Sequence, residues 1–263
     1  MSRIWLIAAW VGLAGLVRAE PPPGGAESLI RWEWRVRWLQ DVPELNLLVW
    51  NQTDHAVFFE FHTEKKETGC GRVAVGGRIA ARSWSHRAVT LLEARGKLPC
   101  ELALSVLSDV GAPLKPPTVQ TGHSTLVIGP RVQELPPARV AAADVTLRAV
   151  VEAGCAPGAA SVRVLVESHS ARPTRVRSGA WGARCADGTK IVWERIERDD
   201  LELPAGGWAV FVDSVRAPKS SQLGACTAWL DVLGGDDAAP VALGHVEFSL
   251  APQSSEVCAD GLE

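Results

Sequence analysis

The sequence predicts an all-β protein: two tandem β-sandwich domains, stapled by disulfides, that follow a cleaved signal peptide. Three observations lead to this prediction. Apolar side chains recur at every second position through most of the chain, six cysteines follow the N-terminal segment, and the second half repeats the pattern of the first.

Residues 1–19 have the organisation of a secretory signal peptide. Arg3 supplies the positive charge, residues 4–16 form a short uncharged run, and Val17-Arg18-Ala19 precedes the expected cleavage before Glu20. The apolar run is shorter than the roughly 20 residues that span a bilayer. A Pro/Gly-rich leader over residues 20–30 follows it. We therefore expect an extracytoplasmic protein, periplasmic or secreted, without a transmembrane segment.

Alternating hydrophobicity predicts strands after the leader. In residues 31–39, Trp32, Trp34, Val36 and Trp38 share one face and charged residues the other, which indicates a half-buried antiparallel strand. Similar patterns predict strands at 46–51, 57–63, 72–79, 88–92, 101–107 and 124–128 in the first half. In the second half they predict strands at 145–151, 161–168, 174–178, 190–196, 208–215, 227–233 and 241–250.

An internal repeat divides the chain. When Cys100 is aligned with Cys226, Gly122-His123 falls four residues out of step with Gly244-His245, a difference that a loop absorbs. Further upstream, Asn51 aligns with Ser168. The repeat predicts a first sandwich over 31–130, a linker over 131–143 that holds Pro136-Pro137, and a second sandwich with a C-terminal tail over 144–263.

About seven short strands in each unit of roughly 110 residues, separated by turns, resemble immunoglobulin-like and fibronectin-like β-sandwiches in general. The chain contains no tyrosine, so the tyrosine corner of true immunoglobulin domains cannot form. Its cysteine spacings are also short for that class. Either sandwich topology remains open.

The six cysteines are expected to form disulfides, as an even number in an exported chain usually does. The repeat makes Cys70 equivalent to Cys185 and Cys100 equivalent to Cys226, which predicts the bridges Cys70–Cys100 and Cys185–Cys226. By elimination, Cys155 pairs with Cys258. The short Cys-x-x-Cys spacing of a zinc or redox site is absent.

Motifs for catalysis and cofactor binding are weak. There is no Gly-x-Ser-x-Gly element for a serine nucleophile, and His123 and His245 recur as strand-entry residues. His55, His62 and His86 could hold a metal only if the fold brought them together. We expect no enzyme activity, no cofactor and no metal. The net charge of −3, without a basic cluster, argues against nucleic acid as a partner.

The candidate partner-binding surface consists of Phe58, Trp84, Arg175 and Arg177. Exposed aromatic rings could anchor a protein or a sugar, although most must belong to the core, and edge arginines also protect sheets from aggregation. The Asn51-Gln52-Thr53 sequon is interpreted as a turn.

These observations favour an exported, non-enzymatic binding or assembly module with a protein or glycan partner. One alternative is an inhibitor or accessory subunit of an exported hydrolase that acts through loops 64–71 or 217–224. The other is a metal-dependent enzyme that uses the first-half histidines.

Overall fold

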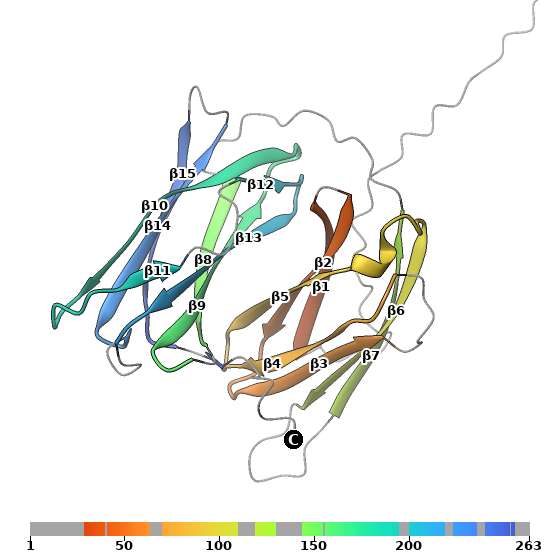
Figure 1. The fold of residues 1–263 in the computed structure, drawn as a ribbon, viewed down its shortest axis with the longest axis horizontal. Coiled ribbons are helices and arrows are strands. Elements are labelled where there is room, and N and C mark those ends of the chain that lie inside the picture. Colours follow the sequence, from red (N-terminus) through yellow and green to blue (C-terminus); the bar gives the residue numbers. More distant parts are fainter. Residues whose placement is uncertain are drawn as a thin grey trace, which may run out of the picture.

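The computed structural model describes residues 29–39, 41–63, 70–109, 119–129, 144–154, 156–194, 200–218, 223–235, 240–252 and 254–255. Within these ranges the protein is all-β, and its strands pair antiparallel except for one short parallel pair near the C-terminus (Figure 1). The predicted signal peptide, the linker, Cys155 and Cys258 lie outside the described residues. No helix in the described ranges is long and apolar enough to cross a membrane.

The strands of the N-terminal half form two layers. One layer has the order β1-β2-β5 and consists of β1 (Ile30–Leu39), β2 (Val42–Asn51) and β5 (Trp84–Thr90). The other has the order β4-β3-β6-β7 and consists of β3 (Val57–Thr63), β4 (Ala74–Ile79), β6 (Cys100–Asp109) and β7 (Val119–Ile128). A short 3-10 helix, η1 (Leu92–Ala94), follows β5.

The C-terminal half has the same layered plan with one added strand. The order β11-β13-β9-β8 combines β8 (Val145–Ala153), β9 (Ala159–Ser168), β11 (Val192–Glu194) and β13 (Trp208–Arg216). The order β12-β10-β14-β15 combines β10 (Thr174–Cys185), β12 (Asp200–Leu203), β14 (Cys226–Gly234) and β15 (Val241–Ser249).

A hydrophobic core fills the space between the two layers of each half. In β1 the predicted alternation is observed, because Trp32 and Trp34 are buried and the intervening Glu33 is partly exposed. Trp34 packs edge-to-face on Phe61 of the opposite layer, with 4.9 Å between ring centroids. In the C-terminal half, two adjoining clusters take the corresponding place around Val164 and Val162.

The two halves share a strand register at the residues that the sequence repeat aligned. Gly122 lies opposite Val106 in the β6–β7 pair, and Gly244 lies opposite Val232 in the β14–β15 pair. The four-residue difference in spacing therefore falls between these positions, toward the turn of each hairpin.

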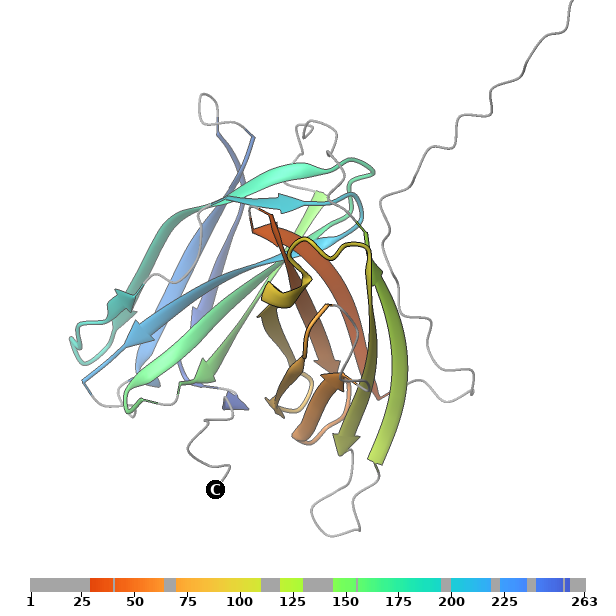
Figure 2. The same ribbon diagram turned by 45° about the vertical axis from the view of Figure 1, so that its right-hand side comes forward.

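A short strand near the C-terminus connects the halves. β16 (Ser254–Ser255) runs parallel to β8 and antiparallel to β4, and it joins the two groups of strands into one nine-stranded sheet. Figure 2 shows β4 and β8 close to this segment from a second direction.

Several strand boundaries differ from those predicted. The strand expected over 88–92 begins at Trp84 and ends at Thr90, whereas the one expected over 190–196 is described only over Val192–Glu194. The strand expected to end at Ser178 continues to Cys185 through an irregular register between Ser178 and Trp181. β12 was not predicted, because four residues give too short an alternation to distinguish from a loop.

Candidate functional site

The outer faces of the β1-β2-β5 layer and of the β11-β13-β9-β8 layer meet where the halves join. Leu48 and Trp84 from β1-β2-β5 pack with Leu165, Trp208 and Val150 from β13-β9-β8 in one buried cluster. Figure 1 shows these layers facing one another between the halves. Corresponding positions meet here: Leu48 and Leu165 precede Asn51 and Ser168 by three residues each. We call this contact the joint.

The expectation that Trp84 belongs to an exposed surface is wrong. Trp84 is 5 % exposed and lies in the joint. The alternation does place its ring on the outer face of β5, opposite Trp50 in the ladder. That outer face is covered by the C-terminal half, which the local sequence pattern cannot show.

Trp208 contacts three side chains of the N-terminal half across the joint. Its indole Nε1 donates a hydrogen bond to Glu33 Oε2 at 3.0 Å. The Arg35 guanidinium lies over its ring, 5.2 Å from the centroid, and the His86 ring meets it edge-on at 6.1 Å. An aromatic ring held by a hydrogen bond and a cation has a defined orientation, so Trp208 fixes one half against the other.

Glu152 is the buried charge of the joint. Its side chain is fully buried and lies between Arg87 of the N-terminal half, at 2.9 Å, and Arg163 of its own half. Ser85 Oγ donates a hydrogen bond to Glu152 Oε1 at 2.6 Å. A buried carboxylate requires such partners, because leaving a charge unpaired in the interior costs several kcal/mol. The arrangement therefore supports the packing of the halves.

A polar chain leads from the edge of β1 to the joint. Arg37 pairs with Glu44, whose carboxylate also accepts from Asn46 Nδ2 at 2.9 Å. Asn46 Oδ1 then accepts a hydrogen bond from His86 Nε2 at 2.9 Å. Burial lowers the pKa of His86 well below its ordinary value, and the nearby charges of Arg163, Arg87 and Arg37 lower it further. His86 is therefore neutral at pH 7.

The histidines do not converge. His86 lies on β5 and His62 on β3, and these strands belong to different layers, so the neighbouring-strand arrangement that a metal site required is not formed. His55 contacts Asp54 at 3.1 Å, and this hydrogen bond is the largest cause that lowers the pKa of Asp54. No group of three or more metal-ligating side chains occurs among the described residues.

Phe58 lies on the outer face of the β4-β3-β6-β7 layer. Its ring is 46 % exposed, and Glu60, two residues along the same strand face, is also exposed. Arg78 stands opposite Phe58 on β4 and is exposed as well. This small patch of one ring between opposite charges agrees with the position predicted for Phe58.

Arg175 and Arg177 project from the outer face of β10. Arg175 is exposed and lies opposite Glu202, and Arg177 is partly buried and lies opposite Asp200. Each of the two arginines thus stands opposite an acidic residue of β12. They do not lie on the same layer as Phe58, so the four candidate residues do not form one surface.

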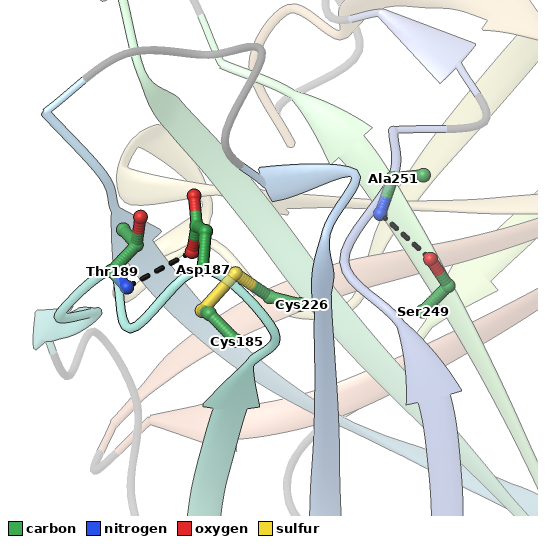
Figure 3. Close-up of a disulfide and its surroundings, with 6 residues drawn as sticks. All are labelled: Cys185, Asp187, Thr189, Cys226, Ser249 and Ala251. Atoms are coloured by element: carbon green, nitrogen blue, oxygen red, sulfur yellow. Dashed lines mark hydrogen bonds between the residues drawn. A yellow bond between two sulfur atoms is a disulfide. The ribbon is translucent and has the colours of Figure 1, made fainter.

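Two of the three predicted disulfides lie within the described residues. Cys70 is bonded to Cys100, and Cys185 is bonded to Cys226 across the β10–β14 ladder (Figure 3). Next to the second bridge, the Thr189 backbone N–H donates to Asp187 Oδ1 at 2.9 Å, which lowers the pKa of Asp187. The predicted Cys155–Cys258 bridge falls outside the described residues.

Asn51 has the turn-forming role that the sequence analysis assigned to it. Its side chain is buried, Nδ2 donates to the carbonyl oxygens of His55 and Ala80 at 2.8 Å, and Oδ1 accepts from the Thr53 backbone N–H at 2.9 Å. Ser168, the aligned residue, accepts a similar bond from the Ser170 N–H at 3.1 Å. In the folded protein the Asn51 amide nitrogen is thus enclosed rather than open to a glycan.

Comparisons with known proteins do not identify the chain. No family model and no curated protein matches it. Among solved structures, it is similar to a protein of unknown function from Porphyromonas gingivalis W83 (14 % identity, TM-score 0.24), which covers 88 % of this chain and 100 % of that one.

Two further matches are red sea bream transglutaminase and the Amycolatopsis orientalis exo-chitosanase CsxA in complex with PNP-beta-D-glucosamine. Their identities are both 11 %, and their TM-scores are 0.25 and 0.26. The aligned regions cover 83 % and 82 % of this chain but only 31 % and 26 % of the matched chains. Likeness at this level carries no argument about function.

Glu152, Arg87 and Arg163 were not predicted from the sequence as parts of a site. In sequence, Glu152 follows Val150-Val151 at a position that alternation assigns to the solvent face. One signal was available: Arg163 lies on the strand predicted over 161–168, and Glu152 directly follows the strand predicted over 145–151. Their burial, however, depends on Arg87, 65 residues away from Glu152.

Proposed function

We propose that the protein is an exported, non-enzymatic binding or assembly module built from two immunoglobulin-like or fibronectin-like sandwich domains. The strand orders β1-β2-β5 with β4-β3-β6-β7, and their counterparts in the C-terminal half, support the domain assignment. The two disulfides support an oxidising compartment outside the cytoplasm.

The joint is the observation that carries this proposal. Each half covers one of its layers against the other half and leaves the opposite layer directed outward. A rigid joint lowers the conformational entropy that a scaffold would lose when a partner binds. The outward layers are therefore the surfaces through which the protein binds or assembles, and the protein partner is expected at Phe58.

Site-specific crosslinking in cells that naturally make the protein tests this function. A photoreactive phenylalanine analogue at position 58 should capture a specific extracytoplasmic partner, whereas the same analogue at the exposed Val192 should not. The purified partner should then bind wild-type protein and bind Phe58→Ala roughly tenfold more weakly, as expected for loss of an interfacial aromatic side chain.

Two results would contradict the proposal. Equal affinity of Phe58→Ala and wild type for the captured partner removes the role of this surface. Retention of the protein in the cytoplasm, or an unprocessed N-terminus before Glu20, removes the export on which the function depends. An exported hydrolase whose activity changes on binding would instead support the accessory-subunit alternative.

A further inference from the structure

On the outer face of the β12-β10-β14-β15 layer, a tryptophan side chain packs over a glycine of the neighbouring strand. Trp229 of β14 lies opposite Gly182 of β10 in the ladder, on the face that points away from the core. A Cβ atom at Gly182 would lie 2.1 Å from Trp229 Cζ2, 2.3 Å from Cε2 and 2.7 Å from Cη2. Three ring atoms therefore occupy the space that a Cβ atom at Gly182 would need, so the indole packs closely over this glycine.

A second glycine of β10 also lacks the space for a side chain. Gly179, in the irregular stretch of β10, is similarly covered by Asp231, whose Cβ would lie 3.0 Å from an added methyl group. Trp229 is partly exposed, so part of its side chain remains accessible to solvent. Because the sheet itself supports the ring, its orientation is fixed before any ligand binds.

Hydrogen-bonding side chains surround this ring. Glu247 lies opposite Trp229 on β15 and is exposed. Asp231, two residues along β14, is 42 % exposed and contacts His245 Nδ1 at 2.7 Å. Arg184, two residues beyond Gly182 on β10, is exposed too. Neighbours on one face of a sheet lie about 4.5–8 Å apart, so these groups are within reach of a ligand seated on the indole.

From this arrangement we infer that Trp229 is the platform of a saccharide-binding site, a specification of the proposed binding function and dependent on it. One face of a pyranose ring presents C–H groups that stack on an aromatic ring, while its equatorial hydroxyls extend outward in the ring plane. The carboxylates of Asp231 and Glu247 accept hydrogen bonds from such hydroxyls, and Arg184 and His245 donate to ring and hydroxyl oxygens.

The surroundings favour a sugar over an apolar protein surface. A specific protein interface buries about 800 Å² on each partner, with an apolar centre. Around Trp229 the outer-face neighbours are charged or polar, and Val241 at the start of β15 is the one large apolar residue among those described on this layer whose side chain is more than 40 % exposed. A single flat ring within a polar rim matches the size and chemistry of a monosaccharide unit.

Calorimetric titration of the purified full chain with cellohexaose, xylohexaose and chitohexaose tests the inference. At least one of these oligosaccharides should bind wild-type protein. Trp229→Ala should weaken that binding roughly tenfold or more, and Trp229→Phe, which keeps a ring, should weaken it less.

Gly182→Ala tests whether binding depends on the position of the Trp229 ring, because the ring is still present in this variant. The added methyl group must displace the indole, so this variant should bind the oligosaccharide several-fold more weakly although Trp229 remains. Val127→Ala is the matched control on the other outer layer, where Val127 of β7 is 62 % exposed, and should bind the oligosaccharide as wild type does. Circular dichroism and thermal unfolding identify any variant that fails to fold, and Trp229→Phe then carries the test.

Three outcomes would overturn the inference: no binding of any of the three hexasaccharides, binding that is unchanged in Trp229→Ala and Gly182→Ala, or binding of decaproline in their place. The last result would assign the ring to a proline-rich peptide. Each outcome leaves the proposed function intact if crosslinking at position 58 still captures a partner, so failure of the saccharide site and failure of the binding function are distinguishable.

Discussion

At the scale of single residues, buried polar side chains define this protein more than exposed ones. Asn51 uses both ends of its amide to close the turn after β2, and Asn46 accepts a hydrogen bond from His86 and donates one to Glu44. Each lies where an unpaired polar group would cost about 1–3 kcal/mol, so each must have its partners. From the sequence alone, polar side chains of this kind are expected at the surface. In the fold they are buried and hold the structure together.

The lowered pKa of His86 predicts that the stability of the protein depends on pH. Its pKa in the folded protein is well below the ordinary 6.5, whereas the unfolded chain has the ordinary value. Below about pH 6.5 the unfolded state binds a proton that the folded state excludes, so stability falls as the pH falls. We therefore expect the free energy of unfolding to fall as the pH is lowered from about 7.5 to about 5.5, measured by urea unfolding at each pH.

The variant His86→Val supplies the control for this effect. Val210 occupies the corresponding place in the C-terminal half, two residues after Trp208 as His86 is two residues after Trp84, so valine is compatible with this position of the layer. The variant loses the bond to Asn46 and is less stable at pH 7.5. Its stability should nevertheless change less between pH 7.5 and 5.5, and an unchanged slope would refute the assignment to His86.

At the scale of strands and turns, cysteine pairing gives the sharpest prediction. Ser254 and Ser255 of β16 lie opposite Glu152 and Ala153 of β8 in a parallel pair. Cys258 follows Ser255 by three residues and Cys155 follows Ala153 by two, so the chain lengths suit a bridge between them. Peptide mapping without reduction should find Cys70–Cys100, Cys185–Cys226 and Cys155–Cys258.

Removing the last bridge should act on stability as well as on connectivity. A disulfide between residues as far apart in the chain as Cys155 and Cys258 contributes about 2–5 kcal/mol to the free energy of unfolding. Cys155→Ala combined with Cys258→Ala should lower the free energy of unfolding by that amount. A mapped bridge between any of Cys70 or Cys100 and any cysteine of the C-terminal half would contradict the pairing.

Much of the strand pattern was predictable because alternation depends only on which face of a strand meets a core. Val57–Thr63 has the predicted bounds, and Phe59 and Phe61 are buried while Phe58 and Glu60 are exposed. Alternation identifies an outer face but not what lies against it. For this reason Phe58 was placed correctly and Trp84 was not, and the burial of Glu152 depended on residues from both halves that no local pattern connects.

At the scale of the whole molecule, the joint connects the two halves through three kinds of contact. An apolar cluster around Trp84 and Trp208, a buried carboxylate shared by both halves and the short strand β16 all cross between them. Interfaces between domains of one chain are often small and polar enough to permit movement. This one buries large aromatic rings and an ion pair, so we expect the halves to unfold together.

Glu152→Gln tests that cooperativity. The substitution keeps the shape of the side chain and removes its charge, which leaves Arg87 and Arg163 buried without their counter-ion. Breaking a buried ion pair in this way costs about 3–5 kcal/mol. Because Arg87 belongs to one half and Arg163 to the other, the cost should appear in both halves. Hydrogen exchange measured across a urea series on peptides from β3 and β14 should show both opening at the same, lower urea concentration than in wild type.

Glu167→Gln on the neighbouring strand is the matched control. Glu167 pairs with Arg148 on the same outer face, at 3.2 Å, but both side chains are partly exposed to solvent. An exposed pair contributes less than about 1 kcal/mol, so this variant should unfold close to wild type. If Glu152→Gln behaved like Glu167→Gln, the buried carboxylate would not support the joint. If it lowered the stability of β14 alone, the halves would be independent, and the rigidity on which the proposed scaffold depends would have to come from β16.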